Sequence, residues 1–178
     1  MKIGITGGMG SGKSYICQRL KARGIEVYDS DQAAKRLMHT SADIQRQLTD
    51  LIGSLEKADI AKFLLADEAN AQAIDRIVHP AVFRDFEQSG CQWLECAILF
   101  ESGFYRLVDR VIVVTAPEEV RLQRIMHRDG ISREKAQQWL CRQWPQDEVR
   151  RRADFEIVND GQADIGTQID NLLKSITK

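Results

Sequence analysis

The glycine-rich segment Gly7–Ser14 constrains the fold of this chain more than any other feature. It follows the apolar run Lys2–Thr6 and precedes a stretch that favours a helix. Its sequence fits the pattern GxxxxGK[ST], whose glycines let backbone N–H groups crowd against phosphate oxygens. The amino terminus of the following helix adds the positive end of its dipole. The segment therefore predicts a nucleoside triphosphate site, with Lys13 at the β- and γ-phosphates and Ser14 as a Mg²⁺ ligand.

The rest of the chain alternates strand-like and helical segments, which is typical of an α/β fold with a parallel sheet. The expected strands are Lys2–Thr6, Ile25–Tyr28, Gln92–Leu99, Arg110–Thr115 and Phe155–Val158. The expected helices include Lys13–Arg23, one from Pro117 to near Gly130, and one capped by Ser132 and running through Gln143. We therefore expect a P-loop NTPase fold with a five-stranded, mainly parallel sheet flanked by helices.

The interval from Gln32 to Ser89 contains no convincing strand and is mostly helical in pattern. It is too long for a single crossover between two strands, so we interpret it as a helical insertion. Ligands of doubly wound folds bind at the carboxyl edge of the sheet. An insertion over that edge is well placed to hold a second substrate.

Composition and charge exclude several classes of function. The net charge of −1 argues against a nucleic-acid-binding protein. The four cysteines form no CxxC pair, and the three histidines show no zinc spacing. We expect reduced thiols, no membrane segment and a cytoplasmic location, because no apolar run is long enough to span a bilayer. No protein partner is indicated.

The region Arg121–Arg152 is locally basic, with nine lysines and arginines against four acids. A solvated helical face and a site for a polyanion such as a nucleotide both fit this pattern. Arg121, Arg124 and Arg128 recur at helical spacing and can share a face. Closing these guanidinium groups over a triphosphate would exclude water and stabilise the transferring charge.

Acidic residues follow two of the expected strands. Asp29 and Asp31 come directly after the second strand, where a carboxylate can orient a hydroxyl and accept its proton. Alternatively, Asp31 serves only as an N-cap for the next helix. Glu101 ends the apolar run from Leu94 to Phe100, a Walker-B-like pattern, and is a candidate to hold a magnesium-bound water or to contact the acceptor.

A triphosphate site serves several classes of protein. A GTPase switch is disfavoured because the chain lacks an NKxD guanine motif. A small-molecule kinase needs an acid beside the acceptor hydroxyl and an arginine-bearing lid, and both are available. An ATP-gated regulatory module without turnover is the non-enzyme alternative.

Taken together, the motifs resemble dephospho-CoA kinases, P-loop kinases of the nucleoside-monophosphate-kinase-like group. The resemblance covers roughly residues 2 to 161. It rests on the segments ITGGMGSGKS, VYDSDQAAKRL, IVHPAVF, AILFESG, LVDRVIVVTAPEEVRLQRIMHRDG and ADFEIVNDG. It implies a transferase that uses ATP and magnesium to phosphorylate the ribose 3′-hydroxyl of dephospho-CoA, the last step of coenzyme A biosynthesis. A kinase acting on a nucleoside monophosphate or on shikimate is the alternative.

The resemblance also implies three parts and a set of site residues. The parts are a nucleotide-binding core (1–31, 90–120 and 153–178), an acceptor-binding insertion (32–89) and a lid (121–152). Asp31 would face the 3′-hydroxyl with Asp29 in support, and His79 and Pro80 would shape the acceptor pocket. With the assignments made above, the expected catalytic residues are Asp31, Lys13 and Arg128. The expected ATP-binding residues are Gly8, Met9, Gly10, Ser11, Gly12, Lys13, Ser14, Tyr15, Arg124, Asn159 and Gly161. The expected acceptor-binding residues are Asp29, Asp31, His79, Pro80 and Glu101.

The chain departs from the family pattern at a few positions. Ala97 replaces a proline, Arg121 replaces a glutamine early in the lid helix, and Trp139 replaces an arginine. The segment 53–59 is also shortened. None of these changes removes Lys13 or Asp31, so we expect an active enzyme.

Overall fold

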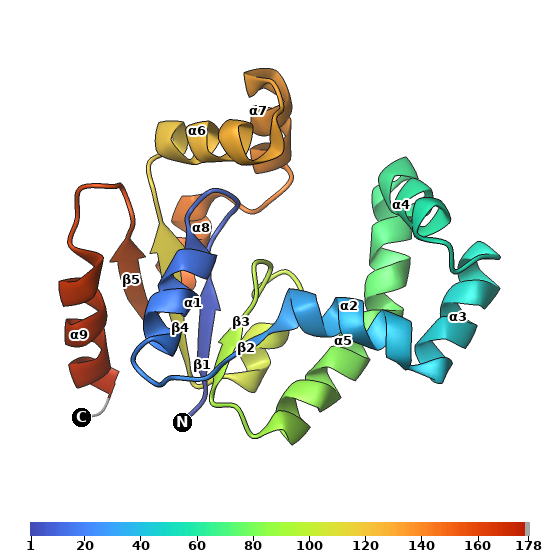
Figure 1. Cartoon of the computed structure of the whole chain (residues 1–178), viewed down its shortest axis with the longest axis horizontal. Coiled ribbons are helices and arrows are strands. Elements are labelled where there is room, and N and C mark those ends of the chain that lie inside the picture. Colours follow the sequence, from blue (N-terminus) through green and yellow to red (C-terminus); the bar gives the residue numbers. More distant parts are fainter. Residues whose placement is uncertain (177–178) are drawn as a thin grey trace. The chain divides into compact units, whose positions relative to one another are not determined.

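The computed structural model describes residues 1–176, which form two compact units (Figure 1). The sheet unit comprises Met1–Tyr28 and the chain from Cys91 onward, and the helical unit comprises Asp29–Gly90. The three-part division into core, insertion and lid that the sequence indicates stays a prediction.

The sheet unit is built on five strands in the order β2-β3-β1-β4-β5. They are β1 (Ile3–Thr6), β2 (Val27–Asp29), β3 (Trp93–Glu95), β4 (Arg110–Thr115) and β5 (Phe155–Val158). β1 pairs in parallel with β3 and β4, and β4 pairs in parallel with β5. The expected α/β fold is confirmed. Because parallel strands share a direction, their carboxyl ends meet at one edge of the sheet.

Within residues 1–176, five α-helices belong to the sheet unit, and the first and the last of them pack on the sheet through alternate strand residues. The helices are α1 (Lys13–Lys21), α6 (Glu118–Asp129), α7 (Arg133–Cys141), α8 (Gln146–Arg152) and α9 (Ile165–Ile176). Ile3 and Ile5 of β1 belong to a buried cluster with Leu20 of α1 and Ile169 of α9. Side chains two residues apart on a strand share a face, so α1 and α9 cover the same face of the sheet.

The third strand is shorter than predicted. β3 ends at Glu95, whereas the sequence predicted a strand from Gln92 to Leu99. After Glu95 the chain turns, and Ser102 closes the turn by donating from its backbone N–H and its hydroxyl to the Ile98 carbonyl at 2.8 and 2.6 Å. Periodicity alone cannot distinguish a buried strand from another buried apolar segment, and this turn buries its apolar side chains without pairing.

The helical unit contains α2 (Ser30–Thr40), α3 (Ala42–Ile52), α4 (Lys57–Ala66) and α5 (Glu68–Ser89). The expectation of a mostly helical segment is therefore met within these residues. Pro80 lies inside α5 and does not end it, although a proline in a helix interior removes one hydrogen bond. Figure 1 shows that the axis of α5 changes direction along its length.

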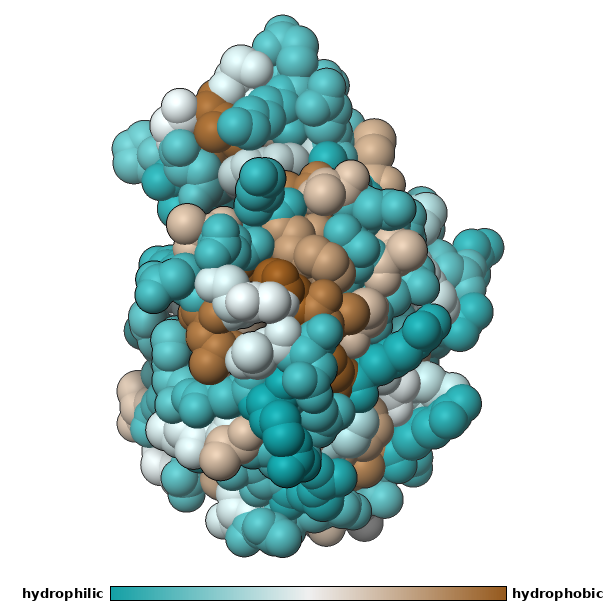
Figure 2. Space-filling model, turned by 90° about the vertical axis from the view of Figure 1, so that its right-hand side faces the viewer, coloured by the Kyte–Doolittle hydropathy of each residue, from teal (hydrophilic) through white to brown (hydrophobic). Residues whose placement is uncertain are grey.

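Smaller differences concern helix ends and the surface. α1 ends at Lys21 rather than Arg23, and α7 ends at Cys141 rather than Gln143. Figure 2 shows one face of the molecule, where apolar residues gather amid a mainly hydrophilic surface. Leu65 of the helical unit is the most exposed of the large apolar side chains between residues 1 and 176. Within that same range, no helix is both long and apolar enough to cross a membrane.

Candidate active site

The phosphate loop, Gly7–Ser14, joins the carboxyl end of β1 to the amino end of α1. Gly10 and Gly12 have positive φ angles of 77° and 85°, which residues with a Cβ rarely adopt. Gly12 is the N-cap of α1 and provides no side-chain acceptor for the first N–H groups of the helix. A helix amino terminus of this kind favours an anion. The local geometry therefore suits a phosphate group.

Helix α6 packs directly against the phosphate loop. A Cβ on Gly10 would lie 2.6 Å from the backbone oxygen of Arg121 and 2.9 Å from its Cα. Arg124 donates from Nη1 to the carbonyl oxygens of Gly10 and Ser11 at 3.2 and 3.3 Å. The loop glycines thus serve a second purpose, which the sequence analysis missed: they let a helix approach the loop backbone.

The Met9 residue of the loop is held from both sides by residues that lie far away in the sequence. Its N–H donates to Gln143 Oε1 at 2.7 Å. Its carbonyl oxygen accepts a hydrogen bond from Arg121 Nε at 2.9 Å. Gln143 follows α7 and Arg121 belongs to α6, so the region predicted to form the lid braces the loop.

Glu95 is the last residue of β3, and its carboxylate contacts the first turn of α1. Its Oε1 is 2.5 Å from Lys13 Nζ and 3.4 Å from Ser14 Oγ. The thiol of Cys17, one turn further along α1, also hydrogen-bonds to Glu95. Burial raises the pKa of this thiol far above its ordinary value, and the negative charge of Glu95 raises it further. Glu95 is therefore a buried acceptor for several donors from α1.

Glu95 is a residue beside the phosphate loop that the sequence analysis missed, and it takes the strand-end position that the sequence analysis gave to Glu101. Glu95, not Glu101, is the acid at the end of the third strand. Glu101 is exposed in the turn that follows, where it lines a small cavity with Arg121 and Gln143. A charged residue between apolar neighbours, as in Leu94-Glu95-Cys96, was the only sequence signal for a buried acid.

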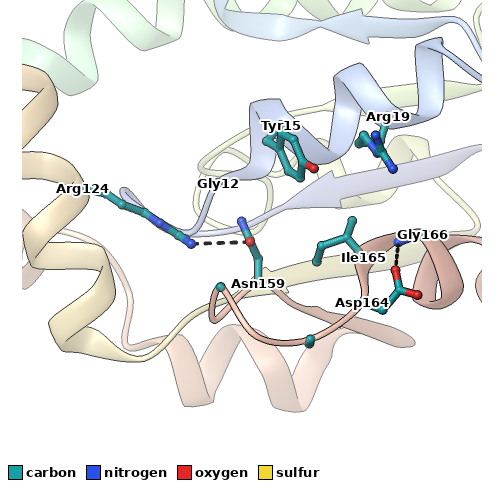
Figure 3. Close-up of a pocket in the computed structure, with 10 residues that line it drawn as sticks. Gly12, Tyr15, Arg19, Arg124, Asn159, Asp164, Ile165 and Gly166 are labelled. Carbon is teal, nitrogen blue, oxygen red and sulfur yellow. Dashed lines mark hydrogen bonds between the residues drawn. The ribbon is translucent and has the colours of Figure 1, made fainter.

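A cavity of about 590 Å³ opens beside the phosphate loop (Figure 3). Asn159 forms part of its wall and donates from Nδ2 to the Ser11 carbonyl at 2.8 Å. Figure 3 shows Tyr15 and Arg19 on α1 facing Ile165 across the cavity. The lining residues are Gly12, Tyr15, Arg19, Arg124, Asn159, Gly161, Ala163, Asp164, Ile165 and Gly166. The structure thus brings four predicted ATP-binding residues outside the glycine motif together in one cavity: Tyr15, Arg124, Asn159 and Gly161.

Arg128 lies apart from the hydrogen bonds that surround the loop. Its guanidinium group pairs with the neighbouring Asp129, from Nη2 to Oδ2 at 2.7 Å. This pairing raises the pKa of Arg128. Both residues are at the end of α6. The predicted contact between Arg128 and a phosphate stays a prediction.

The helical unit carries two of the predicted acceptor-binding acids, Asp29 and Asp31. Asp29 is the N-cap of α2 and accepts from the Gln32 N–H at 2.9 Å. Asp31 is in the first turn of α2 and is not its cap, so the alternative role considered for Asp31 falls to Asp29.

His79 is on α5, with Nε2 3.3 Å from Asp75 Oδ1. Burial lowers the pKa of His79, while the charges of Asp75 and Asp31 oppose this shift. The structure therefore places Asp31 close enough to His79 for their charges to interact. Pro80 follows His79 in the same helix.

The residues at the start of α1 fit a magnesium ion. Ser14 Oγ and Glu95 Oε1 are hard oxygen donors 3.4 Å apart. Mg²⁺ is usually bound by one or two carboxylates together with substrate phosphates and water, rather than by a cage of protein ligands. Residues 1–176 contain no group of three or more His, Cys, Asp or Glu side chains arranged for a metal.

A phosphate loop after β1 of a parallel sheet in the order 2-3-1-4-5, with arginines from α6 at the loop, defines a P-loop kinase. A family model described as dephospho-CoA kinase matches residues 1–164. The chain belongs to the dephospho-CoA kinase family.

Individual relatives agree with this assignment. A dephospho-CoA kinase of Bacteroides fragilis is 37% identical over 97% of this chain and 91% of its own length. A dephospho-CoA kinase of Porphyromonas gingivalis is 40% identical, over 88% of this chain and 85% of its own. The crystal structure of a Thermus thermophilus protein superposes with a TM-score of 0.87 at 29% identity, covering 100% of this chain and 98% of that one.

Proposed function

We propose that this chain transfers the γ-phosphoryl group of ATP to the ribose 3′-hydroxyl of dephospho-CoA, giving CoA and ADP. The observation that carries the proposal is the phosphate loop of a dephospho-CoA kinase family member, with Lys13, Ser14 and Glu95 gathered at one point. The reaction would complete coenzyme A biosynthesis.

In this proposal the sheet unit binds the nucleotide. The triphosphate lies in the phosphate loop, where backbone N–H groups and the Lys13 ammonium group neutralise its charge. Asn159 and Gly161 lie beside the adenine in the cavity of about 590 Å³, and Tyr15 forms another part of its wall. Arg124 supports the loop through the carbonyl oxygens of Gly10 and Ser11. When bound, Mg²⁺ at Ser14 would neutralise charge on the β- and γ-phosphates.

The helical unit supplies four of the five residues proposed for the acceptor. Asp31 accepts the proton of the 3′-hydroxyl as its oxygen attacks the γ-phosphorus, and Asp29 supports the segment as the N-cap of α2. His79 and Pro80 shape the pocket for the acceptor. In the same proposal, Arg128 contacts a phosphate group of ATP, and Glu101 contacts the acceptor.

The test is a direct assay of the products. The purified protein is mixed with Mg²⁺ and ATP, and ADP and CoA are measured with dephospho-CoA, AMP or shikimate as the acceptor. We expect CoA and ADP in equal amounts with dephospho-CoA and no acceptor-dependent ADP with the other two. Turnover with AMP or shikimate but not with dephospho-CoA would show a kinase and would refute dephospho-CoA as its acceptor. ATP binding without turnover on any acceptor would favour the regulatory module.

A further inference from the structure

The cavity of about 590 Å³ beside the phosphate loop has two ends that differ in their polar side chains. At the end next to the loop, Arg124 donates from Nη2 to Asn159 Oδ1 at 3.5 Å, and its Nη1 donates to two loop carbonyl oxygens. The Asn159 amide in turn donates from Nδ2 to the Ser11 carbonyl at 2.8 Å. The polar atoms at this end are therefore largely engaged within the protein.

The other end of the cavity carries Arg19 of α1. Its Cζ lies 5.9 Å from the centroid of the Tyr15 ring, and a Cβ on Gly166 would lie 3.9 Å from its Nη2. Hydrogen bonds from Thr167 lower the pKa of Asp164, and the nearby charge of Arg19 lowers it further. Within residues 1–176, the Arg19 side chain donates no hydrogen bond and forms no ion pair. Its fork of N–H donors is therefore available to a ligand in the cavity.

Apolar side chains form the walls between the two ends. Tyr15 and Ile165 face each other across the cavity (Figure 3), and the Tyr15 ring is exposed. Ligand pockets commonly combine such apolar walls with a few polar groups that fix orientation and specificity. A flat heterocycle fits between an aromatic ring and an aliphatic side chain. The Arg19 guanidinium group then lies at the edge of the base.

The two purine bases offer different edges to a guanidinium group. The N7 and O6 atoms of guanine are neighbouring acceptors, whereas adenine presents the acceptor N7 beside its amino donor. The planar fork of Arg19 can therefore donate two hydrogen bonds to guanine and one to adenine. We propose that Arg19 is a specificity-determining residue that lets the cavity accept guanine, so that GTP serves as a second phosphoryl donor beside ATP. This contact is independent of the NKxD motif, which the chain lacks.

The inference rests on the proposed nucleotide site and extends the proposed reaction to a second donor. With GTP, the acceptor oxygen bonds to the γ-phosphorus, and the bond from that phosphorus to the β,γ-bridging oxygen breaks. The hydroxyl proton passes to Asp31, and GDP leaves. A general electrostatic role for Arg19 makes a different prediction, because losing the charge then weakens ATP and GTP by the same factor.

The experiment compares the two nucleotides as donors and as ligands. The kcat/KM for ATP and for GTP is measured with Mg²⁺ and saturating dephospho-CoA, following CoA together with ADP or GDP. Calorimetric titration of each nucleotide without an acceptor gives the affinities independently of turnover. We expect the natural protein to form CoA and GDP from GTP. Arg19→Ala should lower the affinity and the kcat/KM for GTP relative to ATP by about 5- to 150-fold, the discrimination that one bidentate arginine contact provides.

Two further variants control the interpretation. Arg19→Lys keeps the positive charge but replaces the planar fork with a point charge, so GTP should again lose more than ATP. Lys21→Ala removes an exposed cation at the end of α1 and should keep the ratio of the natural protein. Far-ultraviolet circular dichroism and a thermal melt establish that each variant is folded.

The proposal is overturned if the natural protein binds ATP but not GTP, or if Arg19→Ala weakens both nucleotides by the same factor. CoA formed from ATP but not from GTP also contradicts the second donor and leaves the proposed function intact. The predicted change in the affinity ratio, without CoA from either donor, upholds the contact of Arg19 with the base and contradicts only the proposed acceptor. No binding of either nucleotide contradicts both proposals.

Discussion

The Arg121 side chain donates from Nε to the Met9 carbonyl at 2.9 Å, although only 7% of Arg121 is exposed. Burial lowers the pKa of this guanidinium group, and only the charge of Glu118 opposes the shift. No carboxylate between residues 1 and 176 forms an ion pair with Arg121. A buried cation without such a partner must be compensated by the groups that it contacts, and here these include the backbone of the phosphate loop.

We expect Arg121→Ala to lower the free energy of unfolding by about 1–3 kcal/mol, because the Met9 carbonyl loses its buried donor. Arg121→Gln keeps a polar side chain at this position, and its neutral amide costs less to bury than a guanidinium group. We therefore expect Arg121→Gln to lose less stability than Arg121→Ala. Urea unfolding of the two variants measures the difference. Equal stability of Arg121→Ala and the natural protein would refute the bracing role.

The parts of the fold that sequence could predict are those set by local chemistry. β4 and β5 have the predicted bounds, and the phosphate loop follows β1 as predicted. Ser132 caps α7 through the Lys135 N–H, as its position before a helical segment indicated. In each case the deciding signal lies within a few residues of the element.

The parts that were missed depend on contacts distant in sequence. Gln143 and Met9 are 134 positions apart, and Lys13 and Glu95 are 82 apart. Glu95 lies at the site because β3 pairs with β1 in the register Ile5↔Glu95. No local pattern contains that register, so the sequence alone gave Glu101 the role of the strand-end acid.

Ser11 offers a second test, because its buried hydroxyl group forms no hydrogen bond within residues 1–176. An unsatisfied buried hydroxyl costs about 1–3 kcal/mol. Ser11→Ala removes that cost, and we expect it to raise the free energy of unfolding by about 1 kcal/mol.

Ser102→Ala is the matched contrast, since the Ser102 hydroxyl donates to the Ile98 carbonyl at 2.6 Å. Its removal should lower the stability by about 1 kcal/mol. Urea unfolding of both variants measures whether each substitution raises or lowers the free energy of unfolding. A loss of stability in Ser11→Ala comparable to that in Ser102→Ala would show that the Ser11 hydroxyl has a stabilising partner.

The burial of His79 predicts how the stability of the protein depends on pH. Burial lowers the pKa of His79 in the folded protein below its ordinary value of about 6.5. The imidazole of His79 therefore binds a proton more readily in the unfolded chain than in the folded protein. The contribution of neutral His79 to stability is present above about pH 6.5 and is lost as the pH falls below that value. We expect a lower melting temperature at pH 5.5 than at pH 7.5, and a smaller difference in His79→Gln.

If His79→Gln and the natural protein lose the same stability between the two pH values, other groups cause the loss. Proton NMR of the imidazole signals measures the pKa of His79 directly, and a value above 6.5 would contradict the burial argument.

Asp31 is the most direct test of the proposed chemistry. Asp31→Asn retains the shape of the side chain but cannot accept the hydroxyl proton, so we expect kcat to fall by about 10²–10⁴, the usual contribution of general acid–base catalysis. The affinity for ATP should change little, because the phosphate loop and the cavity beside it belong to the sheet unit. Asp50→Asn, at an exposed position of α3, is the control and should leave kcat unchanged.

The same variant has a readout that does not depend on turnover. The negative charge of Asp31 raises the pKa of His79 against the effect of burial, so Asp31→Asn should lower that pKa further, whereas Asp50→Asn should not move it. A normal kcat in Asp31→Asn with a displaced His79 titration would place Asp31 beside His79 and remove it from the chemistry. A reduced kcat with an unchanged titration would contradict the electrostatic contact while retaining the role of Asp31 in phosphoryl transfer.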